Sequence, residues 1–263
     1  MAYTTIDDPS AYFQTALYTG NAGTNNITFD GNSDMQPNLI WIKERGGTGS
    51  HIWVDTVRGI SSSSTPFIKS NSTGAEVTNN VNAFVTSSNS DGFSLGADSY
   101  FTDVNKNSST YASWNWKAGT SFTNDASATG IGTIDSTGSV NQDAGFSIVE
   151  WVATGSNATI KHGLSTAPSM IILKTTSVQK NWVVGHDSIG WGKNLWLNGS
   201  DAVYSDNTFW NNTAPTNSVF SVGTAGDTND SGETIIAYCF AEKQGYSKFG
   251  SYTGNGNADG TFV

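Results

Sequence analysis

The pattern of apolar and polar positions along the chain predicts a β protein. In residues 37–43 (PNLIWIK) a proline precedes an almost unbroken apolar run that ends in lysine, and the pattern returns in residues 168–174 (PSMIILK). Proline fits the first position of a strand, where its missing N–H does no harm, and an unbroken apolar run is typical of a strand buried on both faces. We therefore expect each stretch to be a central strand.

The flanks of these two stretches repeat as well. Residues 18–20 correspond to 153–155, residues 91–96 to 218–223, and residues 114–116 (WNW) to 238–240 (YCF). The offset between the copies falls steadily along the chain, as it would if the same strands were joined by slightly shorter loops. Self-similarity of this kind indicates two tandem copies of one module.

Each copy is expected to be a β-sandwich. The first contains about eight short apolar or alternating runs at the 8–12-residue spacing that suits two packed sheets such as a jelly roll. No window shows a convincing 3.6-residue apolar period over a dozen residues. The sequence therefore predicts an all-β chain of two tandem antiparallel, jelly-roll-like sandwich modules, with the start of a third at the C-terminus.

The repeats divide the chain into five segments. These are an N-terminal arm (1–10), module 1 (11–119), a linker rich in Ser, Thr and Gly (120–143), module 2 (144–245) and the start of a third repeat (246–263). The arm is either a loose terminus or an anchor onto a larger assembly. Because residues 252–257 restate 153–157, we expect these 263 residues to be the head of a longer polypeptide. Each module has the size of a usual domain and is expected to bury its own core.

Composition restricts the partners. The chain carries 22 acidic and 12 basic residues, a net charge of −10, and this surface repels the phosphate backbone of nucleic acids. The first residues lack a basic and then apolar leader, and no apolar run approaches the length of a membrane span. We therefore expect synthesis in the cytoplasm, no nucleic-acid partner and no membrane insertion.

No residue pattern predicts catalysis or a cofactor. Cys239 is the only cysteine and lies in an apolar run, the three histidines lack zinc-like spacing, and the glutamates form no evident pair. Oxygen-bearing side chains alternate after Asp103 and Asp227, as at the start of a calcium loop, although a tight turn rich in Asn and Asp is the favoured interpretation. We expect no catalytic residue, no metal site, no cofactor and no enzymatic activity.

Aromatic residues offer a binding hypothesis. Four tryptophans lie within residues 182–210, interleaved with Asn, Asp and Lys, a composition able to stack on sugar rings and bond to their hydroxyls. Two of them align roughly with core positions of module 1, which leaves Trp191 and Trp210 as candidate ligand-binding residues. Buried subunit contacts would explain these two rings equally well.

The repeated residues also resemble a known family. Residues 12–20 (YFQTALYTG), the turn at 29–31, and residues 36–43, 91–94 and 111–117 are similar to a repeated β-rich module in structural proteins of marine bacteriophages, including cyanophages and pelagiphages. The resemblance covers nearly the whole chain. It implies a fold like the lectin or laminin-G jelly rolls and a tail-fibre-like role, but no biochemical site. Module 2 departs from the pattern at residues 238–240.

These observations together predict a virion structural protein: a tail-fibre or surface-appendage subunit that mounts or contributes to host recognition. A capsid decoration protein is the alternative within the structural class, and a glycan-binding lectin module or a glycan depolymerase are the alternatives outside it. The expected partners are other virion proteins, of tail or capsid, and copies of the chain itself, with a host surface glycan left open. The expected location is the virion, after synthesis in the cytoplasm of the bacterial host.

Overall fold

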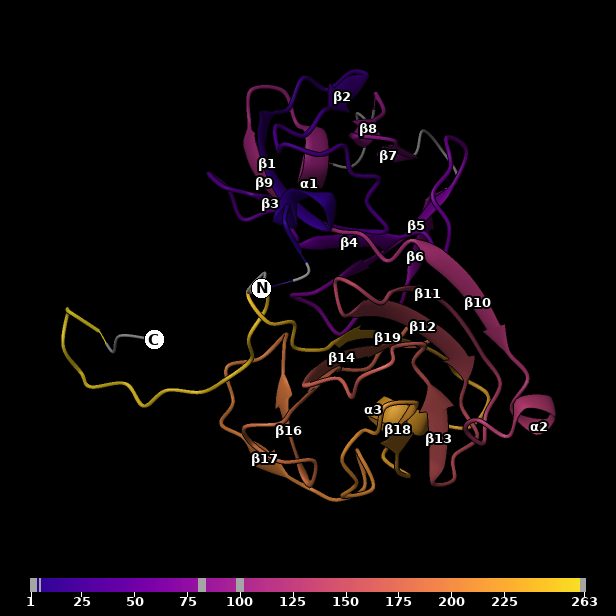
Figure 1. Cartoon of the computed structure of the whole chain (residues 1–263). Coiled ribbons are helices and arrows are strands. Elements are labelled where there is room, and N and C mark those ends of the chain that lie inside the picture. Colours follow the sequence, from indigo (N-terminus) through magenta and orange to yellow (C-terminus); the bar gives the residue numbers. More distant parts are fainter. Residues whose placement is uncertain (1–3, 5, 80–83, 98–101, 261–263) are drawn as a thin grey trace.

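The computed structural model of the chain describes residues 4, 6–79, 84–97 and 102–260 (Figure 1). Within these ranges it contains nineteen strands, one 3-10 turn, η1 (Pro9–Ala11), and three helices of a single turn each, α1 (Thr102–Asn105), α2 (Ala126–Thr129) and α3 (Gly226–Asn229). All strand pairs within the sheets are antiparallel. The prediction of an all-β sandwich fold is confirmed.

The first half of the chain builds one large and one small sheet. The large sheet has six strands, in the spatial order β1 (Phe13–Thr19), β9 (Thr110–Trp116), β3 (Leu39–Glu44), β4 (Ile52–Asp55), β5 (Thr65–Lys69) and β6 (Val77–Asn79). The small sheet has the order β2 (Asn25–Ile27), β8 (Gly92–Leu95) and β7 (Val85–Asn89). We call this half module 1.

The second half repeats this plan with additions. Its large sheet has eight strands, in the order β10 (Thr120–Asn124), β11 (Ser136–Asn141), β12 (Phe146–Val152), β19 (Thr234–Phe240), β14 (Met170–Thr175), β15 (Trp182–His186), β16 (Lys193–Trp196) and β17 (Tyr204–Ser205). Its small sheet pairs β13 (Ala158–Lys161) with β18 (Val219–Val222). The order β12-β19-β14-β15-β16 matches β1-β9-β3-β4-β5 of module 1, so the sequence repeat corresponds to a repeat of topology. We call this half module 2.

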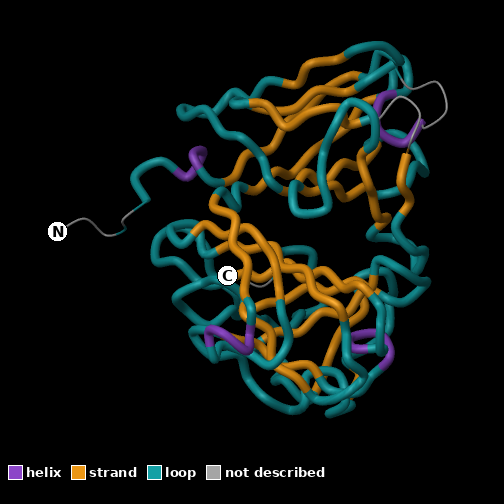
Figure 2. Tube along the Cα trace, turned by 90° about the vertical axis from the view of Figure 1, so that its right-hand side faces the viewer, coloured by secondary structure: helices purple, strands orange, loops and turns teal. Residues whose placement is uncertain are grey.

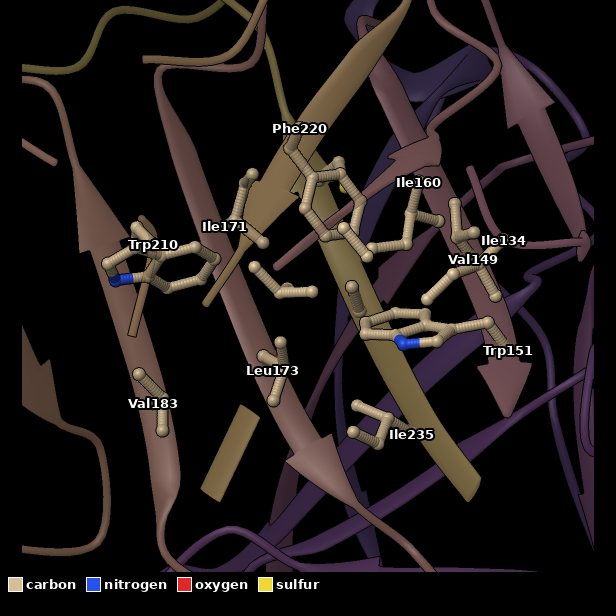
Figure 3. Packing of buried hydrophobic residues seen from close by; sticks show 14 of the residues in the cluster. Ile134, Val149, Trp151, Ile160, Ile171, Leu173, Val183, Trp210, Phe220 and Ile235 are labelled. Atoms are coloured by element: carbon tan, nitrogen blue, oxygen red, sulfur yellow. The ribbon is translucent and has the colours of Figure 1, made fainter. Parts of the chain in front are cut away.

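Each module has a core between its large and small sheets. In module 1 alternate residues of the large sheet, among them Ile40, Ile42, Val54 and Phe67, meet Phe93 and Leu95 of the small sheet. In module 2 the corresponding core contains Val149, Trp151, Ile160, Ile171, Leu173 and Phe220, seen from close by in Figure 3. The period of two along each strand supplies these inward side chains.

A third core joins the two modules. The other face of each large sheet is also apolar, and the two faces pack together through Leu39, Trp53, Ile68, Ile148, Ile172, Trp182, Ile236 and Tyr238. The molecule therefore has four layers, with the small sheets outermost, and Figure 2 shows the two groups of strands one above the other. Each fully buried aliphatic side chain here contributes roughly 1.5–3 kcal/mol relative to an exposed position. The modules thus share a core in addition to their own, which the sequence did not reveal.

Residues 120–143, predicted as a linker, are ordered structure. They form β10, α2 and β11, which extend the large sheet of module 2 beyond β12. Ile134 is buried in the core between the two sheets of module 2, which we call the second core. Phe122 and Val140 pack against this core. Threonine and valine suit strands, so a segment rich in Ser and Thr can form an outer hairpin as readily as a loose connection.

The predicted start of a third repeat forms no strand in the part that the structure describes. Residues 246–260 contain turns and irregular backbone, and residues 250–260 are all exposed. Figure 1 shows this segment leaving the body of the molecule. Tyr246 and Phe249, at its beginning, pack against the third core. The third repeat therefore stays a prediction.

Candidate functional site

A row of tryptophans crosses the large sheet of module 1 on the face that meets module 2. Trp114, Trp41 and Trp53 are direct neighbours across β9, β3 and β4. Their ring centroids are 5.3 Å apart for Trp41 and Trp114, and 5.1 Å apart for Trp41 and Trp53, with tilted planes. Tilted and edge-to-face rings at this spacing attract one another beyond the area that they bury. The row continues into module 2, where Trp53 lies edge-on to Tyr238 at 4.8 Å.

An aromatic pocket of about 310 Å³ opens beside this row, between the modules. Module 1 contributes Trp41 and Trp116, module 2 contributes Phe146 and Phe240, and the C-terminal segment contributes Tyr246 and Phe249. The volume lies at the lower end of the range typical of small-molecule sites. The lining offers apolar surface and ring faces rather than acid or base groups, so its chemistry is stacking and burial.

Two polar atoms on rings that line this pocket are unpaired. Among the described residues, the indole N–H groups of Trp41 and Trp53 are buried and have no hydrogen-bond partner. A buried donor without an acceptor typically costs about 1–3 kcal/mol. An ordered water is one common partner of such a group.

A buried ion-pair cluster lies on the same interface. The Arg58 guanidinium contacts the Asp55 carboxylate at 2.6 Å and the Glu76 carboxylate at 3.0 Å, and it also donates to the backbone oxygen of Trp53 at 3.2 Å. From module 2, the Tyr238 hydroxyl donates to Asp55 Oδ2 at 2.8 Å. Asp55 and Tyr238 are both fully buried. The cluster therefore holds the turn after β4 against β19 of the other module.

The electrostatics of this cluster favour charge on Arg58. Burial alone would lower the pKa of Arg58, but Asp55 and the other acidic neighbours outweigh it and raise that pKa. Burial, reinforced by the Asp55 charge, raises the pKa of Tyr238 well above its usual value. Nearby Glu150 on β12 has a raised pKa because it is partly buried and lies near the acidic Asp55. Nothing in this arrangement resembles a nucleophile with an adjacent base, and its evident role is to hold the two modules together.

Lys174 links the modules at a second point. This fully buried residue on β14 donates from Nζ to the backbone oxygens of Thr73 in module 1, at 3.1 Å, and of Lys180, at 2.8 Å. Burial lowers the pKa of Lys174 to about 8, against an opposing effect of Asp227. The Thr73 loop is also held by backbone bonding, since Lys180 N donates to Thr73 O at 3.0 Å.

The structure places the two sequence-predicted ligand residues in a core. Trp191 is 6% exposed and Trp210 is 0% exposed, and the rings meet edge-to-face at 5.3 Å within the second core (Figure 3 labels Trp210). Both rings pack over Gly185, where an added Cβ would clash with Trp191 Cζ3. The Trp191 N–H is bonded to Asp187 Oδ1 at 2.8 Å. Since stacking on a sugar needs an accessible ring face, the structure corrects this hypothesis, and both residues fill core volume.

In the two Asn-rich loops, a buried asparagine side chain holds neighbouring turns in place. Asn229, at the end of α3, is buried; its Oδ1 accepts from Thr154 N at 3.1 Å, and its Nδ2 donates to Gly223 O at 2.8 Å and to Ser156 O. Asn105, at the end of α1, makes the same bonds in module 1, to Asn21 N, Gly23 O and Gly96 O. The Asn105 side chain thus fixes the β1–β2 turn and the end of β8. The Asn229 side chain fixes the β12–β13 turn and the end of β18 in module 2.

The carboxylates proposed for calcium have other neighbours. Asp227 lies 3.4 Å from both the backbone and side-chain nitrogens of Asn181, and Asp230 pairs with Lys180 at 3.1 Å. The side chain of Asp103 lies outside the described residues. Within the part of the chain that the structure describes, no group of three or more His, Cys, Asp or Glu side chains could hold a metal ion.

Two further titratable groups are buried. His162 is fully buried, its Nδ1 accepts from Leu164 N at 3.1 Å, its Nε2 lies 3.0 Å from Thr216 O, and burial lowers its pKa to about 4. Cys239 is fully buried, and burial raises the pKa of its thiol to about 12. A neutral imidazole and a protonated thiol fit structural positions.

The residues of the aromatic pocket escaped sequence reasoning. The pattern predicts only strand positions for Trp41, Trp116 and Phe240, and only part of a third repeat for Tyr246 and Phe249. A usable signal existed in Trp41, because the equivalent position in module 2 is Ile172, so the large ring is specific to module 1.

Comparison with known proteins identifies a family. A family model described as "Domain of unknown function (DUF7483)" matches residues 8–263. Neither the curated proteins nor the solved structures contain a match. Among the described residues, no helix has both the length and the apolar character needed to cross a membrane.

Proposed function

We propose that this chain, which belongs to the DUF7483 family, is a structural subunit of a bacteriophage virion, built into a tail fibre or another surface appendage. The observation that carries the structural role is the third core, which joins two sandwich modules into one four-layer body. The virion assignment comes from the sequence resemblance described above. A subunit that holds a distal element in a fixed position relative to its anchor needs this rigidity. Two domains joined only by a flexible linker would move independently of each other.

The placement of the two ends of the described chain supports a mounting role. The rings of Tyr12, next to the N-terminal arm, and Tyr246, in the C-terminal segment, meet edge-to-face at 6.1 Å. The arm itself is held by Asp8, which accepts from Ser10 N at 2.9 Å and from Ser33 Oγ at 2.6 Å. The two segments therefore lie next to each other where they join the body, beside the aromatic pocket. A partner that binds at this place would contact both segments.

The test is to locate the chain in purified virions. Antibodies raised against the purified protein, detected by gold labelling in electron microscopy, should mark the tail or its fibres. Label on the capsid lattice would favour the head-surface alternative over the appendage. Washed virions that carry no label, in a preparation where a known capsid protein is labelled, would overturn the virion role.

A second candidate function is glycan binding at the aromatic pocket. The specific observation is the combination of the half-buried rings of Trp41 and Trp116, which line the pocket, with the buried and unpaired N–H of Trp41, which together offer stacking and one hydrogen-bond donor. The test is a glycan array probed with the wild-type chain and with Trp116→Ala, using Trp196→Ala, also half-buried but in the second core, as the matched control. Binding that is lost only in Trp116→Ala supports the site, and absence of binding to any glycan contradicts it.

A further inference from the structure

The outer edge of β1 is the unprotected edge of the large sheet of module 1. Within the described residues β1 is an end strand, seven residues long (FQTALYT), with no charge, proline or glycine. Proteins commonly guard such edges with charges, prolines, bulges or covering segments, because unpaired backbone groups invite another strand. Among the residues that the structure describes, nothing of this kind guards the edge at β1.

The backbone hydrogen bonds at both ends of β1 show which groups face outward. Lys117 N donates to Tyr12 O at 3.0 Å, and Gly20 N donates to Ser109 O at 2.8 Å, so the even-numbered residues of β1 direct their backbone groups to β9. The odd-numbered residues Phe13, Thr15 and Leu17 direct their N–H and C=O groups away from the sheet. In the described chain, the backbone N–H and C=O groups of these three residues are therefore free to form an antiparallel ladder with another strand.

Module 2 shows what covers this edge in the same fold. There the equivalent bond runs from Ala241 N to Gly145 O at 2.7 Å, so the outward residues of β12 are the even-numbered ones. These residues pair with β11: Phe146 lies opposite Asn141, and Ile148 lies opposite Ser139. An antiparallel strand on this edge is thus part of the fold of module 2, and the equivalent position at β1 is open in the described chain.

The side chains on the open edge are apolar and partly exposed. Leu17 is 69% exposed, the highest fraction among the exposed large hydrophobic side chains that the structure describes. The other long end strand, β10, has only one large apolar side chain, Phe122, and that ring packs against the second core. The end strands β6 and β17 have only three and two residues. Of the four end strands of the two large sheets, β1 is the longest and the one with the most exposed apolar side chain.

We propose that β1 pairs antiparallel with β1 of a second copy of this chain, about a two-fold axis at Thr15. In that register Thr15 faces Thr15 of the second copy, and Phe13 faces Leu17 of the second copy, so each exposed leucine gains an aromatic neighbour. The pattern is self-complementary, as a two-fold contact requires. The result is a continuous twelve-stranded sheet formed by the two six-stranded sheets.

The contact would continue an interface that already exists. The Phe13 ring packs against Trp116 at 4.9 Å and lines the aromatic pocket of the third core. Leu17 of the second copy would therefore extend that core outward. Because β1 is uncharged, the opposition to pairing comes from the net charge of −10 on each copy, a long-range repulsion that salt screens. Dimerisation should strengthen with added salt.

The experiment measures the mass of the purified full chain in solution by light scattering, over concentrations up to about 100 μM. The wild type should be a dimer. Thr15→Pro removes an outward N–H, a change that edge strands tolerate, and Leu17→Lys places a charge on the edge; each should raise the dissociation constant at least tenfold. Val152→Lys is the matched control, because Val152 is 56% exposed but lies on the covered strand β12.

Disulfide formation tests the register directly. Thr15→Cys should form a disulfide-linked dimer under mild oxidation, whereas Thr19→Cys should not, because position 19 lies far from its own copy across the two-fold axis. A monomeric wild type would overturn the proposal, as would a dimer unaffected by Thr15→Pro and Leu17→Lys or an equal yield of linked dimer from Thr19→Cys. This inference names a contact surface for the proposed structural role, but it is measured without virions. A monomer would therefore refute the pairing and leave the virion localisation to its own test.

Discussion

Replacing Tyr238 by phenylalanine tests the contact between the modules with the smallest structural change. The variant keeps the ring, and with it the edge-to-face contact with Trp53 at 4.8 Å, but removes the hydroxyl that donates to Asp55 Oδ2 at 2.8 Å. A hydrogen bond to a charged group contributes about 1.5–3 kcal/mol. Asp55 keeps its bonds to Arg58 and to the backbone N–H of Val57, so it is not left unpaired. We expect the variant to lose about 2 kcal/mol of unfolding free energy.

Tyr18→Phe is the matched control, because the Tyr18 hydroxyl donates to the neutral backbone oxygen of Val104 at 2.8 Å within module 1. This variant should lose about 1 kcal/mol, the usual contribution of a neutral hydrogen bond. The assay is urea unfolding at pH 7 followed by circular dichroism, with the slope of free energy against urea unchanged in both variants. A loss for Tyr238→Phe no larger than that for Tyr18→Phe would refute the reasoning that this charged contact stabilises the joined modules.

Three further predictions concern backbone strain and buried charge. Ser108 has a left-handed φ of 64° where module 2 places Gly232 at 84°, so Ser108→Gly should raise the melting temperature, with a gain of roughly 0.5–1 kcal/mol; a lower melting temperature would contradict this. The pKa of Lys174 is lowered from 10.5 to about 8, so above pH 8 the unfolded chain holds a proton that the folded chain has lost. Stability should therefore rise between about pH 8 and 10.5, by up to about 1.4 kcal/mol per pH unit, and urea unfolding of Lys174→Met should show no such rise. The raised pKa of Glu150 means that its carboxylate destabilises the fold once pH rises above the folded pKa, so Glu150→Gln should be more stable than wild type at pH 7 and equal to it in acid, as measured by thermal unfolding at both pH values.

The strands of this fold were predictable because their signals are local. The apolar run of residues 37–43 and its repeat became β3 and β14, each with neighbours on both sides. The run also indicated burial on both faces, which the structure bears out for Leu39, Ile40 and Ile42. The sequence did not say what covers the second face. That partner is the other module, more than a hundred residues away, and no local pattern encodes it.

The candidate site was harder to predict because an unmatched aromatic residue has two explanations. Trp191 and Trp210 lack counterparts in module 1, which suggested an added binding surface. In the structure they fill the space above Gly185, whose equivalent in module 1 is Val54, so extra rings compensate for a missing side chain. Trp41, in contrast, looked like an ordinary strand residue and lines the pocket between the modules. Whether a ring is buried depends on what packs over its strand, and that is a property of the tertiary structure.

The central claim is that the third core makes the two modules one cooperative unit, and hydrogen exchange read by mass spectrometry across a urea titration tests it most directly. Peptides from β3 and β9 report on module 1, and peptides from β14 and β19 report on module 2. The account predicts that all four lose protection at the same urea midpoint with the same slope, as a single two-state transition requires. Separate midpoints, with one module still protected after the other has unfolded, would contradict it.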